Sequence, residues 1–372
     1  MRVALVHDWL VAMRGGEKCL ERIIELFPDA HLYTLFHKPG ATSSSIDAVP
    51  IHASALSKVP GARRHYRKLL PLFPLAIQQF DLSRYDLVIS TSHAVAKAVR
   101  TRPAQPHLCY CFTPMRYIWD QAEAYLGTGI RRAFASPLVH TLRRFDRSTS
   151  SPDRVTRFVA ISTCVQDRIQ QHYDRTAPIV FPPVELDRFP LSSAEREDFY
   201  VMVGGFVPYK QESLAIEAFR GTKRRLVIVG DGPSRRRLAA NAPPNVTLPG
   251  RVSDEELGDI LSRGRALIYP QLEDFGLTAL EAQACGTPVI AFKAGGALDT
   301  VRDAGQADDT GVFFDDPSPS GLRRGLEEFE ARSNQFDPVA IHRHASRFGV
   351  ARFKGEFLDE IGQAIGDATR PA

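Results

Sequence analysis

Residues 273–281, Glu273-Asp-Phe-Gly-Leu-Thr-Ala-Leu-Glu281, set two carboxylates eight residues apart around a glycine. An apolar run ends at Tyr269 shortly before them, and the residues from there to Gly276 have the composition of a loop. From Leu277 onward, apolar residues recur at helical spacing. The pattern predicts a buried strand, a loop and a helix that begins at the glycine.

The start of this helix is suited to a phosphate. The first N–H groups of a helix have no partner within the helix and lie at the positive end of its dipole. The groups in this position belong to Phe275, Gly276, Leu277 and Thr278. Because Gly276 has no side chain, a ligand can approach the backbone closely. The loop and the helix therefore predict an anion site.

The two glutamates limit the kind of anionic ligand that can bind at this site. A carboxylate repels a diphosphate unless it faces a neutral, hydroxylated part of the ligand. Glu273 and Glu281 are therefore interpreted as acceptors for sugar and ribose hydroxyls, which predicts a glycosyl nucleotide. Glutamates at this spacing also occur on solvated helix faces, but the Gly-Thr-Pro-Val that follows favours the binding hypothesis.

Other segments accompany this motif, and the main ones are His7-Asp-Trp-Leu10, Arg14-Gly-Gly-Glu-Lys18, Tyr85-Asp-Leu-Val-Ile-Ser90, Ser92-His-Ala-Val-Ala-Lys97, Thr113-Pro-Met-Arg-Tyr117, Val207-Pro-Tyr-Lys210 and Val229-Gly-Asp-Gly-Pro233. With them, nearly the whole chain resembles the GT-B family of retaining glycosyltransferases that carry an E-x7-E motif (family 4 type). Within that family it is similar to the bacterial mannosyltransferases that build O-antigens and exopolysaccharides. The resemblance implies an α/β fold with two doubly wound, Rossmann-like domains that face each other across a cleft.

Composition is consistent with a folded, two-domain protein. The chain has 372 residues, 44% of them hydrophobic, which suffices for two cores. A net charge of +4 and the lack of a dense basic stripe argue against a nucleic-acid partner. The five cysteines are dispersed and are expected to be reduced. Neither a leader peptide nor an apolar run long enough to span a membrane is expected.

Short apolar runs alternate with amphipathic ones along both halves of the chain. The runs expected as strands are 3–6, 31–35, 87–90, 108–111, 157–161, 200–203, 225–229, 246–248, 266–269 and 289–292. Alternation of this kind predicts a parallel sheet with helices on both faces in each half. Phe181-Pro-Pro-Val184 is interpreted as the linker, since proline stiffens the chain and removes an N–H donor.

These patterns place a domain boundary between residues 1–183 and 184–349. The resemblance implies that the N-terminal domain is the acceptor side and that the second domain binds the nucleotide sugar. The resemblance implies that a helix within 350–372 crosses back to the N-terminal domain. In open α/β sheets, ligands bind at the carboxyl ends of the strands. The loops that follow the strands therefore hold the candidate site residues.

Lys210 is the candidate for stabilising a leaving diphosphate. It lies in a loop just after an expected strand, where its charge can neutralise the negative charge that grows as a glycosidic bond breaks. The alternative is an ordinary solvated lysine at a helix start. Family members often carry an arginine as a second phosphate ligand, and Gly205 stands at that position here.

Two further turns are assigned to the nucleotide pocket by the resemblance. Gly230 begins the Gly-Asp-Gly-Pro turn after an expected strand, and Asp231 within it can equally be a plain turn residue. Val252 lies before Ser253 and Asp254, either of which can cap a helix. The resemblance implies that the backbone around Val252 holds the base.

The N-terminal half supplies a candidate acceptor side. Gly15 and Gly16 form a glycine loop that opens a helix, without the GxGxxG or Walker spacing that NAD or ATP sites require. Asp8 and Trp9 end the first strand and are expected to face the cleft. Trp9 can stack on a sugar ring, and a buried tryptophan beneath the glycine loop is the equal alternative.

The segment around Phe112 is a second departure from the family. Relatives commonly carry a histidine there, implied to touch the donor sugar, and phenylalanine cannot form a hydrogen bond. Three explanations stay open: the contact is dispensable, another residue such as His93 or Arg116 replaces it, or catalysis is impaired. His93 has the alternative role of a cap residue. Arg116 and Tyr117 are expected to address the acceptor.

Residues 63–77, Arg-Arg-His-Tyr-Arg-Lys-Leu-Leu-Pro-Leu-Phe-Pro-Leu-Ala-Ile, place a basic cluster beside an apolar run. Arginines between 131 and 147 extend this basic character. Such a mixture is typical of proteins that bind anionic lipid headgroups. An ordinary amphipathic helix with solvated arginines is the alternative, and the two hypotheses stay open.

The resulting expectation is a hexosyltransferase that uses a nucleoside diphosphate sugar without a metal or other cofactor. Mannose from GDP-mannose is favoured on the resemblance, with UDP-sugars open, and the acceptor is expected to be a lipid-linked or oligosaccharide sugar in cell-surface polysaccharide synthesis. The expected location is the cytoplasm or the inner face of the cytoplasmic membrane. The alternatives are an impaired nucleotide-sugar-binding scaffold and a sugar-phosphate synthase or phosphorylase of the same fold.

Overall fold

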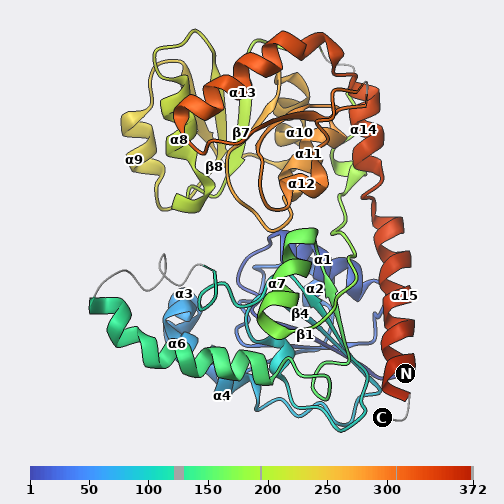
Figure 1. The fold of residues 1–372 in the computed structure, drawn as a ribbon. Coiled ribbons are helices and arrows are strands. Elements are labelled where there is room, and N and C mark those ends of the chain that lie inside the picture. Colours follow the sequence, from blue (N-terminus) through green and yellow to red (C-terminus); the bar gives the residue numbers. More distant parts are fainter. Residues whose placement is uncertain (121–129, 193–194, 307, 370–372) are drawn as a thin grey trace. The chain divides into compact units, whose positions relative to one another are not determined.

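The computed structural model describes residues 1–120, 130–192, 195–306 and 308–369. The chain divides into two compact units, of which the first contains residues 1–181 and 353–372 and the second contains residues 182–352. In Figure 1 the first unit runs from blue to green and ends in the red helix α15, and the second runs from yellow-green to red. Each unit is built around one parallel sheet.

The sheet of the first unit has six parallel strands in the order β3-β2-β1-β4-β5-β6. Their bounds are β1 Val3–His7, β2 His31–Thr34, β3 Ile51–Ala53, β4 Leu87–Ser92, β5 His107–Cys111 and β6 Arg157–Ala160. Strands β1, β4 and β5 are buried along their whole length. They form because their runs of branched and aromatic residues suit a sheet that is covered on both faces.

The helices of the first unit are α1 Gly15–Ile24, α2 Ser44–Asp47, α3 Ala62–His65, α4 Phe73–Ile77, α6 Ile130–Ser148, α7 Thr163–Tyr173 and α15 Val350–Thr369, with 3₁₀ turns η1 Ala55–Lys58, η2 Tyr66–Leu72 and η3 Ala96–Ala98. Residues of α4 and α6 pack in one hydrophobic cluster with β1 and β4. From Phe353 onward α15 belongs to this unit, where Phe353 and Phe357 lie against Tyr110 at ring-centroid distances of 5.8 and 5.5 Å.

The second unit repeats the architecture with the order β12-β11-β10-β7-β8-β9, again all parallel. The strands are β7 Tyr200–Gly204, β8 Leu226–Gly230, β9 Val246–Gly250, β10 Leu267–Tyr269, β11 Val289–Phe292 and β12 Gly311–Phe314. The helices are α8 Glu212–Phe219, α9 Arg235–Asn241, α10 Asp254–Arg263, α11 Leu277–Ala284, α12 Ala297–Thr300, α13 Pro319–Arg332 and α14 Pro338–Ser346, with 3₁₀ turns η4 Leu186–Arg188, η5 Pro208–Lys210 and η6 Ser333–Gln335.

Both sheets reverse their strand order at one place. In the first unit the reversal lies between β1 and β4, and in the second between β7 and β10. Loops that leave the carboxyl ends of two such strands diverge to opposite sides and leave room for a ligand. The fold therefore singles out the loops after β1, β4, β7 and β10.

The two edge strands β3 and β12 were not expected from the sequence, whereas every strand that was expected is present to within two residues at each end. Strand β3 has only three residues, all of them half-buried. Strand β12 begins at Gly311, where a Cβ would lie 1.9 Å from the backbone oxygen of Val289 in β11. Its glycine weakens the strand pattern in the sequence and is required by the close approach of the two backbones.

Candidate functional site

The second unit brings Lys210 and Glu273 together. Lys210 ends the short turn η5 after β7, and Glu273 lies in the loop between β10 and α11. Because β7 and β10 are adjacent and parallel, both loops leave the same edge of the sheet. The Nζ of Lys210 forms an ion pair with Oε1 of Glu273. The two residues that the sequence suggested for phosphate and sugar thus contact each other.

The partners of Glu273 include a second donor. The hydroxyl of Tyr269, the last residue of β10, donates a hydrogen bond to Oε2 of Glu273 at 2.6 Å. Burial and the charge of Glu273 raise the pKa of Tyr269 well above its usual value, so it stays protonated. Burial alone would lower the pKa of Lys210, but the charge of Glu273 and its hydrogen bond outweigh this and raise it. Lys210 is therefore a cation at neutral pH.

Gly276 begins helix α11, as the sequence predicts. Its φ of +98° lies in the left-handed region, which glycine adopts without strain. A Cβ at this position would lie 2.5 Å from the hydroxyl oxygen of Tyr269. Phe275 before it is buried, and Leu277 and Thr278 after it are half-buried. Glu281 lies one turn further along α11 and is 9% exposed.

Two glycine turns pack against each other beside this loop. A Cβ on Gly230 would lie 1.8 Å from the backbone oxygen of Gly204, and one on Gly232 would lie 2.1 Å from that of Gly205. The turns after β7 and β8 are therefore in direct backbone contact. Gly205 itself is exposed, and a Cβ there would have no neighbour within 4 Å.

Val252 lies on the same edge of the sheet, after β9. It is half-exposed and follows Gly250, whose φ is +99°. Ser253 caps α10 by accepting from Glu256 N–H at 3.1 Å. Asp231 serves the turn after β8, because its carboxylate accepts the N–H of Gly232 at 2.8 Å.

Gly295 and Gly296 make a contact with the Glu273 loop that was not predicted from the sequence, and we call this contact the clamp. Gly295 and Gly296 follow β11 and lie against the backbone of the Glu273 loop. Gly296 N–H donates to the carbonyl of Glu273 at 2.9 Å. A Cβ on Gly295 would lie 2.4 Å from that carbonyl oxygen, and one on Gly296 would lie 2.2 Å from the Cα of Phe275. The two adjacent glycines were the feature of the sequence that could have indicated this close contact.

In the first unit, Asp8 holds the loop after β4. Its two carboxylate oxygens accept the backbone N–H groups of four consecutive residues, His93, Ala94, Val95 and Ala96, at 2.7 to 2.9 Å. Asp8 is fully buried. This carboxylate therefore positions the loop rather than presenting itself to a ligand.

His93 begins that loop and its side chain is 23% exposed. Its Nδ1 lies 3.1 Å from Oδ2 of Asp8. Burial lowers the pKa of His93 to about 4, although the charge of Asp8 opposes this shift. His93 is therefore neutral at pH 7, with part of its ring accessible at the carboxyl edge of the sheet.

Trp9 takes the second of its two expected roles. It is 5% exposed and packs among Tyr66, Phe73 and His93, with ring-centroid distances of 4.9, 6.1 and 4.2 Å. A ring buried to this degree has no face left for a sugar. The expectation that Asp8 and Trp9 face a ligand is therefore replaced by a structural role for both.

Phe112 fills the space between the first helix and the sheet. A Cβ on Gly16 would lie 3.3 Å from its ring, and the ring of His7 lies 6.3 Å away, edge to face. Gly15 begins α1 and is half-buried. The glycine loop can thus lie close to Phe112 because Gly16 has no side chain.

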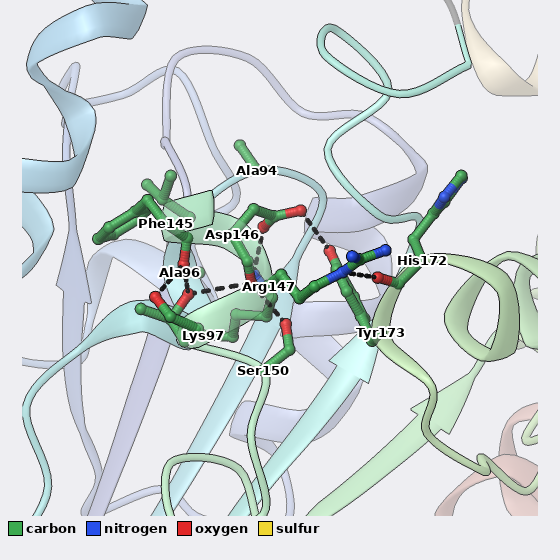
Figure 2. A network of polar contacts seen from close by, with 12 residues as sticks. Ala94, Ala96, Lys97, Phe145, Asp146, Arg147, Ser150, His172 and Tyr173 are labelled. Carbon is green, nitrogen blue, oxygen red and sulfur yellow. Dashed lines mark hydrogen bonds and ion pairs between the residues drawn. The ribbon is translucent and has the colours of Figure 1, made fainter. Parts of the chain in front are cut away.

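Arg116 and Tyr117 are half-buried on a loop that the fold anchors firmly. Two residues further on, Trp119 donates its indole N–H to Asp146 of α6 at 2.8 Å. Figure 2 shows Lys97, Asp146 and Tyr173 pointing toward one another, and the hydroxyl of Tyr173 donates to Asp146 at 2.9 Å. Asp146 therefore ties the loop of Arg116 to the loop of His93 through a buried ion pair.

Residues 63–77 divide into a buried and an exposed part. Phe73, Ala76 and Ile77 lie in the core, while Leu72 and Leu75 are 43% and 69% exposed. The basic residues Arg63, Arg64, Arg67 and Lys68 are all exposed. Of the arginines that extend this character, Arg131 and Arg132 lie outside the side chains that the structure describes.

Within the described ranges, no group of three or more His, Cys, Asp or Glu side chains is arranged to hold a metal ion. Nor does the described part of the chain contain a helix of the length and apolarity that crossing a membrane requires.

Comparison with known proteins identifies several relatives. The profile of the family described as "Glycosyl transferases group 1" matches residues 183–339. A D-inositol 3-phosphate glycosyltransferase from Mycobacterium sp. (strain KMS) is 30% identical over 77% of this chain and 74% of its own length. D-rhamnosyltransferase WbpZ from Pseudomonas aeruginosa is 28% identical over 46% of this chain and 49% of its own length. The chain spans about half the length of two of the relatives that it matches: 49% of WbpZ and 51% of a further glycosyltransferase.

Solved structures share the whole fold. HepE from Anabaena, in complex with UDP-glucose, superimposes with a TM-score of 0.72 and 16% identity, covering 98% of this chain and 100% of its own. The two-domain α/β fold expected from the sequence is confirmed by this likeness and by the two six-stranded parallel sheets.

Proposed function

Because the chain belongs to the glycosyl transferases of group 1 and has the GT-B fold, we propose that it transfers a hexosyl group from a nucleoside diphosphate sugar to a sugar acceptor with retention of configuration. One observation carries this proposal. A lysine and a glutamate, Lys210 and Glu273, meet at the carboxyl ends of the two central strands, beside the N-terminus of α11. That edge of the sheet suits a ligand with an anionic and a hydroxylated part.

Departure of the diphosphate is the step that Lys210 serves. Negative charge grows on the phosphate oxygens as the glycosidic bond breaks, and a fixed cation stabilises that charge. Lys210 is charged at neutral pH, and the backbone N–H groups after Phe275 add the positive end of the helix dipole. The departing phosphate itself takes the proton of the acceptor hydroxyl, so no separate protein base is needed.

The two glutamates orient the neutral parts of the donor. Glu273 accepts hydroxyls of the sugar, and Glu281 accepts hydroxyls of the ribose. Gly205, Gly230 and Val252 line the nucleotide with their backbone. The turns that contain Gly205 and Gly230 approach each other closely. We propose that this chemistry needs no metal ion or other cofactor, which activity in the presence of a chelator would test.

Mannose from GDP-mannose is the donor that we favour, on the resemblance to mannosyltransferases of cell-surface polysaccharide synthesis. UDP-glucose is the first competitor, because the structure of HepE with the same fold holds it. A panel of GDP- and UDP-sugars decides between these donor classes.

A lipid-linked acceptor is supported by the surface of the first unit. Residues 48–80 contain five basic residues and no acidic one, although the whole chain carries a net charge of only +4. Val59, Leu72 and Leu75 in this segment are 48%, 43% and 69% exposed. Exposed apolar side chains among cations are what an anionic membrane surface attracts. We therefore propose peripheral contact with the inner face of the cytoplasmic membrane.

Vesicle flotation tests this contact. With vesicles that contain anionic phospholipid, the wild type should float, and the double variant Leu72→Ser and Leu75→Ser should not. Leu298→Ser, a 54% exposed leucine of the second unit, is the matched control and should float like the wild type. Equal flotation of all three proteins, or of none, would count against the membrane contact.

A soluble phosphorylated acceptor is the second candidate. It is favoured by the D-inositol 3-phosphate glycosyltransferase, which matches this chain over most of its length. An acceptor of this kind needs cations on the first unit. Arg116 and Arg168 are the cations that we consider, and Arg168 contacts Thr113 and Asp120 at 3.3 and 3.4 Å.

The decisive experiment measures transfer and hydrolysis across the donor panel, with a lipid-linked acceptor or a soluble sugar phosphate. Turnover of one donor should be abolished by Glu273→Ala and by Lys210→Ala, while the exposed controls Glu327→Ala and Lys223→Ala keep it. Nucleotide binding without turnover of any donor would instead support an impaired scaffold. Phe112 and Gly205 would then be the first positions to change.

A further inference from the structure

The carboxylate of Glu273 is held on two sides by partners of different mobility. Lys210 contacts Oε1 through a long, flexible side chain from the turn after β7. Tyr269 donates to Oε2 from the end of a buried strand. From the sequence alone, Tyr269 was expected only to end a buried strand.

Tyr269 is fixed by its surroundings. Its side chain is 1% exposed. Its hydroxyl lies so close to Gly276 that a Cβ on that residue would be 2.5 Å from the hydroxyl oxygen. The ring has only two side-chain torsions, so burial leaves its hydroxyl one place to point. In contrast, the four-carbon stem of Lys210 allows its ammonium group to move several ångströms.

If Lys210 binds the diphosphate, as the proposed function requires, it must weaken or leave its contact with Glu273. A sugar hydroxyl then takes the place of the ammonium group at Oε1 of Glu273. A carboxylate that loses one partner is less restrained against rotation at that moment. The bond from Tyr269 prevents this rotation, because it holds the other oxygen throughout the exchange.

We propose that Tyr269 is a positioning residue for Glu273, which keeps that carboxylate aligned on the donor sugar while Lys210 exchanges from the carboxylate to the diphosphate. This inference rests on the proposed function. It predicts that the tyrosine hydroxyl matters for the sugar and not for the nucleotide.

Tyr269→Phe is the direct test, since it removes the hydroxyl and keeps the ring. Tyr200→Phe is a matched control. Tyr200 lies in the same unit, is fully buried, and donates to Oε1 of Glu330 at 2.8 Å from the opposite, amino end of β7. Both variants lose one buried tyrosine–glutamate hydrogen bond, so a purely structural effect should appear in both.

The expected result separates the two variants. In Tyr269→Phe, kcat should fall about tenfold or more, because a hydrogen bond to a charged group is lost, and the KM for the donor should rise because its sugar is held less well. Tyr200→Phe should keep kcat within about twofold. A wild-type kcat in Tyr269→Phe, or equal losses in both variants, would overturn the proposal.

A binding experiment tests the positioning role of Tyr269 independently of turnover. Titration calorimetry with the nucleoside diphosphate and with its sugar conjugate should show that Tyr269→Phe weakens the conjugate alone. Equal loss for both ligands would overturn the positioning role. If the wild type binds neither nucleotide, the proposed function fails first, and the inference fails with it for that separate reason.

Discussion

Gly296 and Phe275 approach each other so closely that a Cβ on the glycine would lie 2.2 Å from the Cα of the phenylalanine. The φ of Gly296 is −67°, which any residue adopts, so the requirement for glycine here is purely steric. The contact presses the loop after β11 onto the loop that carries Glu273. Through it, a glycine 23 residues away in sequence shapes the loop that carries Glu273.

We predict that Gly296→Ala displaces the Glu273 loop. The clash is with backbone, which cannot move aside cheaply, so a loss of about 3 kcal/mol of stability and of most donor binding is expected. Thermal unfolding and calorimetric titration measure the two effects. Gly355→Ala in α15 is the control, because a Cβ there meets nothing within 4 Å, and this change should stabilise its helix by about 0.5–1 kcal/mol. Equal behaviour of the two variants would contradict the clamp.

The sequence predicted every strand except β3 and β12, as well as the helix that starts at Gly276. It also assigned separate roles to Lys210 and Glu273, which stay predictions. It could not predict that these two side chains pair, because 63 residues separate them and their contact depends on strand order. The same holds for Gly295 and Gly296. Their role is visible only when the loops after β10 and β11 lie together.

Burial decided between the two roles that the sequence left open for Trp9, and it contradicted the single role expected for Asp8. Asp8 and Trp9 end a strand at the expected edge, yet four backbone N–H groups occupy Asp8 and aromatic rings surround Trp9. No local pattern distinguishes an inward from an outward side chain just after a strand. The edge strand β3 was missed for a related reason, since three half-buried residues carry too short a pattern.

Asp8 caps the loop after β4 by accepting four of its backbone N–H groups, and this cap gives a second prediction. Asp8→Ala leaves four buried N–H groups of the loop after β4 without their acceptor, so we expect a loss of more than about 3 kcal/mol, seen as a lower midpoint in urea. Asp86→Ala is the control. Asp86 also accepts a backbone N–H, from Arg2 at 2.7 Å, but its side chain is 43% exposed, so the urea midpoint should stay close to that of the wild type. Similar midpoints for both variants would show that the cap contributes little.

His107 gives a third prediction, on pH. It is fully buried, with Nε2 2.9 Å from Ser90 Oγ and Nδ1 2.7 Å from the carbonyl of Arg154, and burial lowers its pKa to about 4. The unfolded chain, with a histidine pKa near 6.5, therefore binds a proton more readily than the folded one between these values. Its contribution to stability is present above about pH 6.5 and is lost as the pH falls toward 4, by up to about 1.4 kcal/mol per pH unit.

Unfolding midpoints measured from pH 7.5 to 5 check this dependence. His107→Gln should be less stable than the wild type at pH 7.5, and its stability should decline less steeply toward pH 5. The exposed His65 provides the control variant His65→Gln, which should follow the wild type throughout. A wild-type slope in His107→Gln would exclude this histidine as a source of the pH dependence.

Gly205 gives the last prediction, which concerns the missing second cation. A Cβ at this exposed position would meet no neighbour within 4 Å, so an arginine can begin there without a backbone clash. If the diphosphate binds beside Lys210, Gly205→Arg should tighten nucleoside diphosphate binding about three- to tenfold, and the gain should shrink as salt increases. Gly205→Gln is the uncharged control of similar length and should show no gain. The same affinity for the arginine and glutamine variants would mean that the phosphates lie elsewhere or that backbone N–H groups already satisfy them.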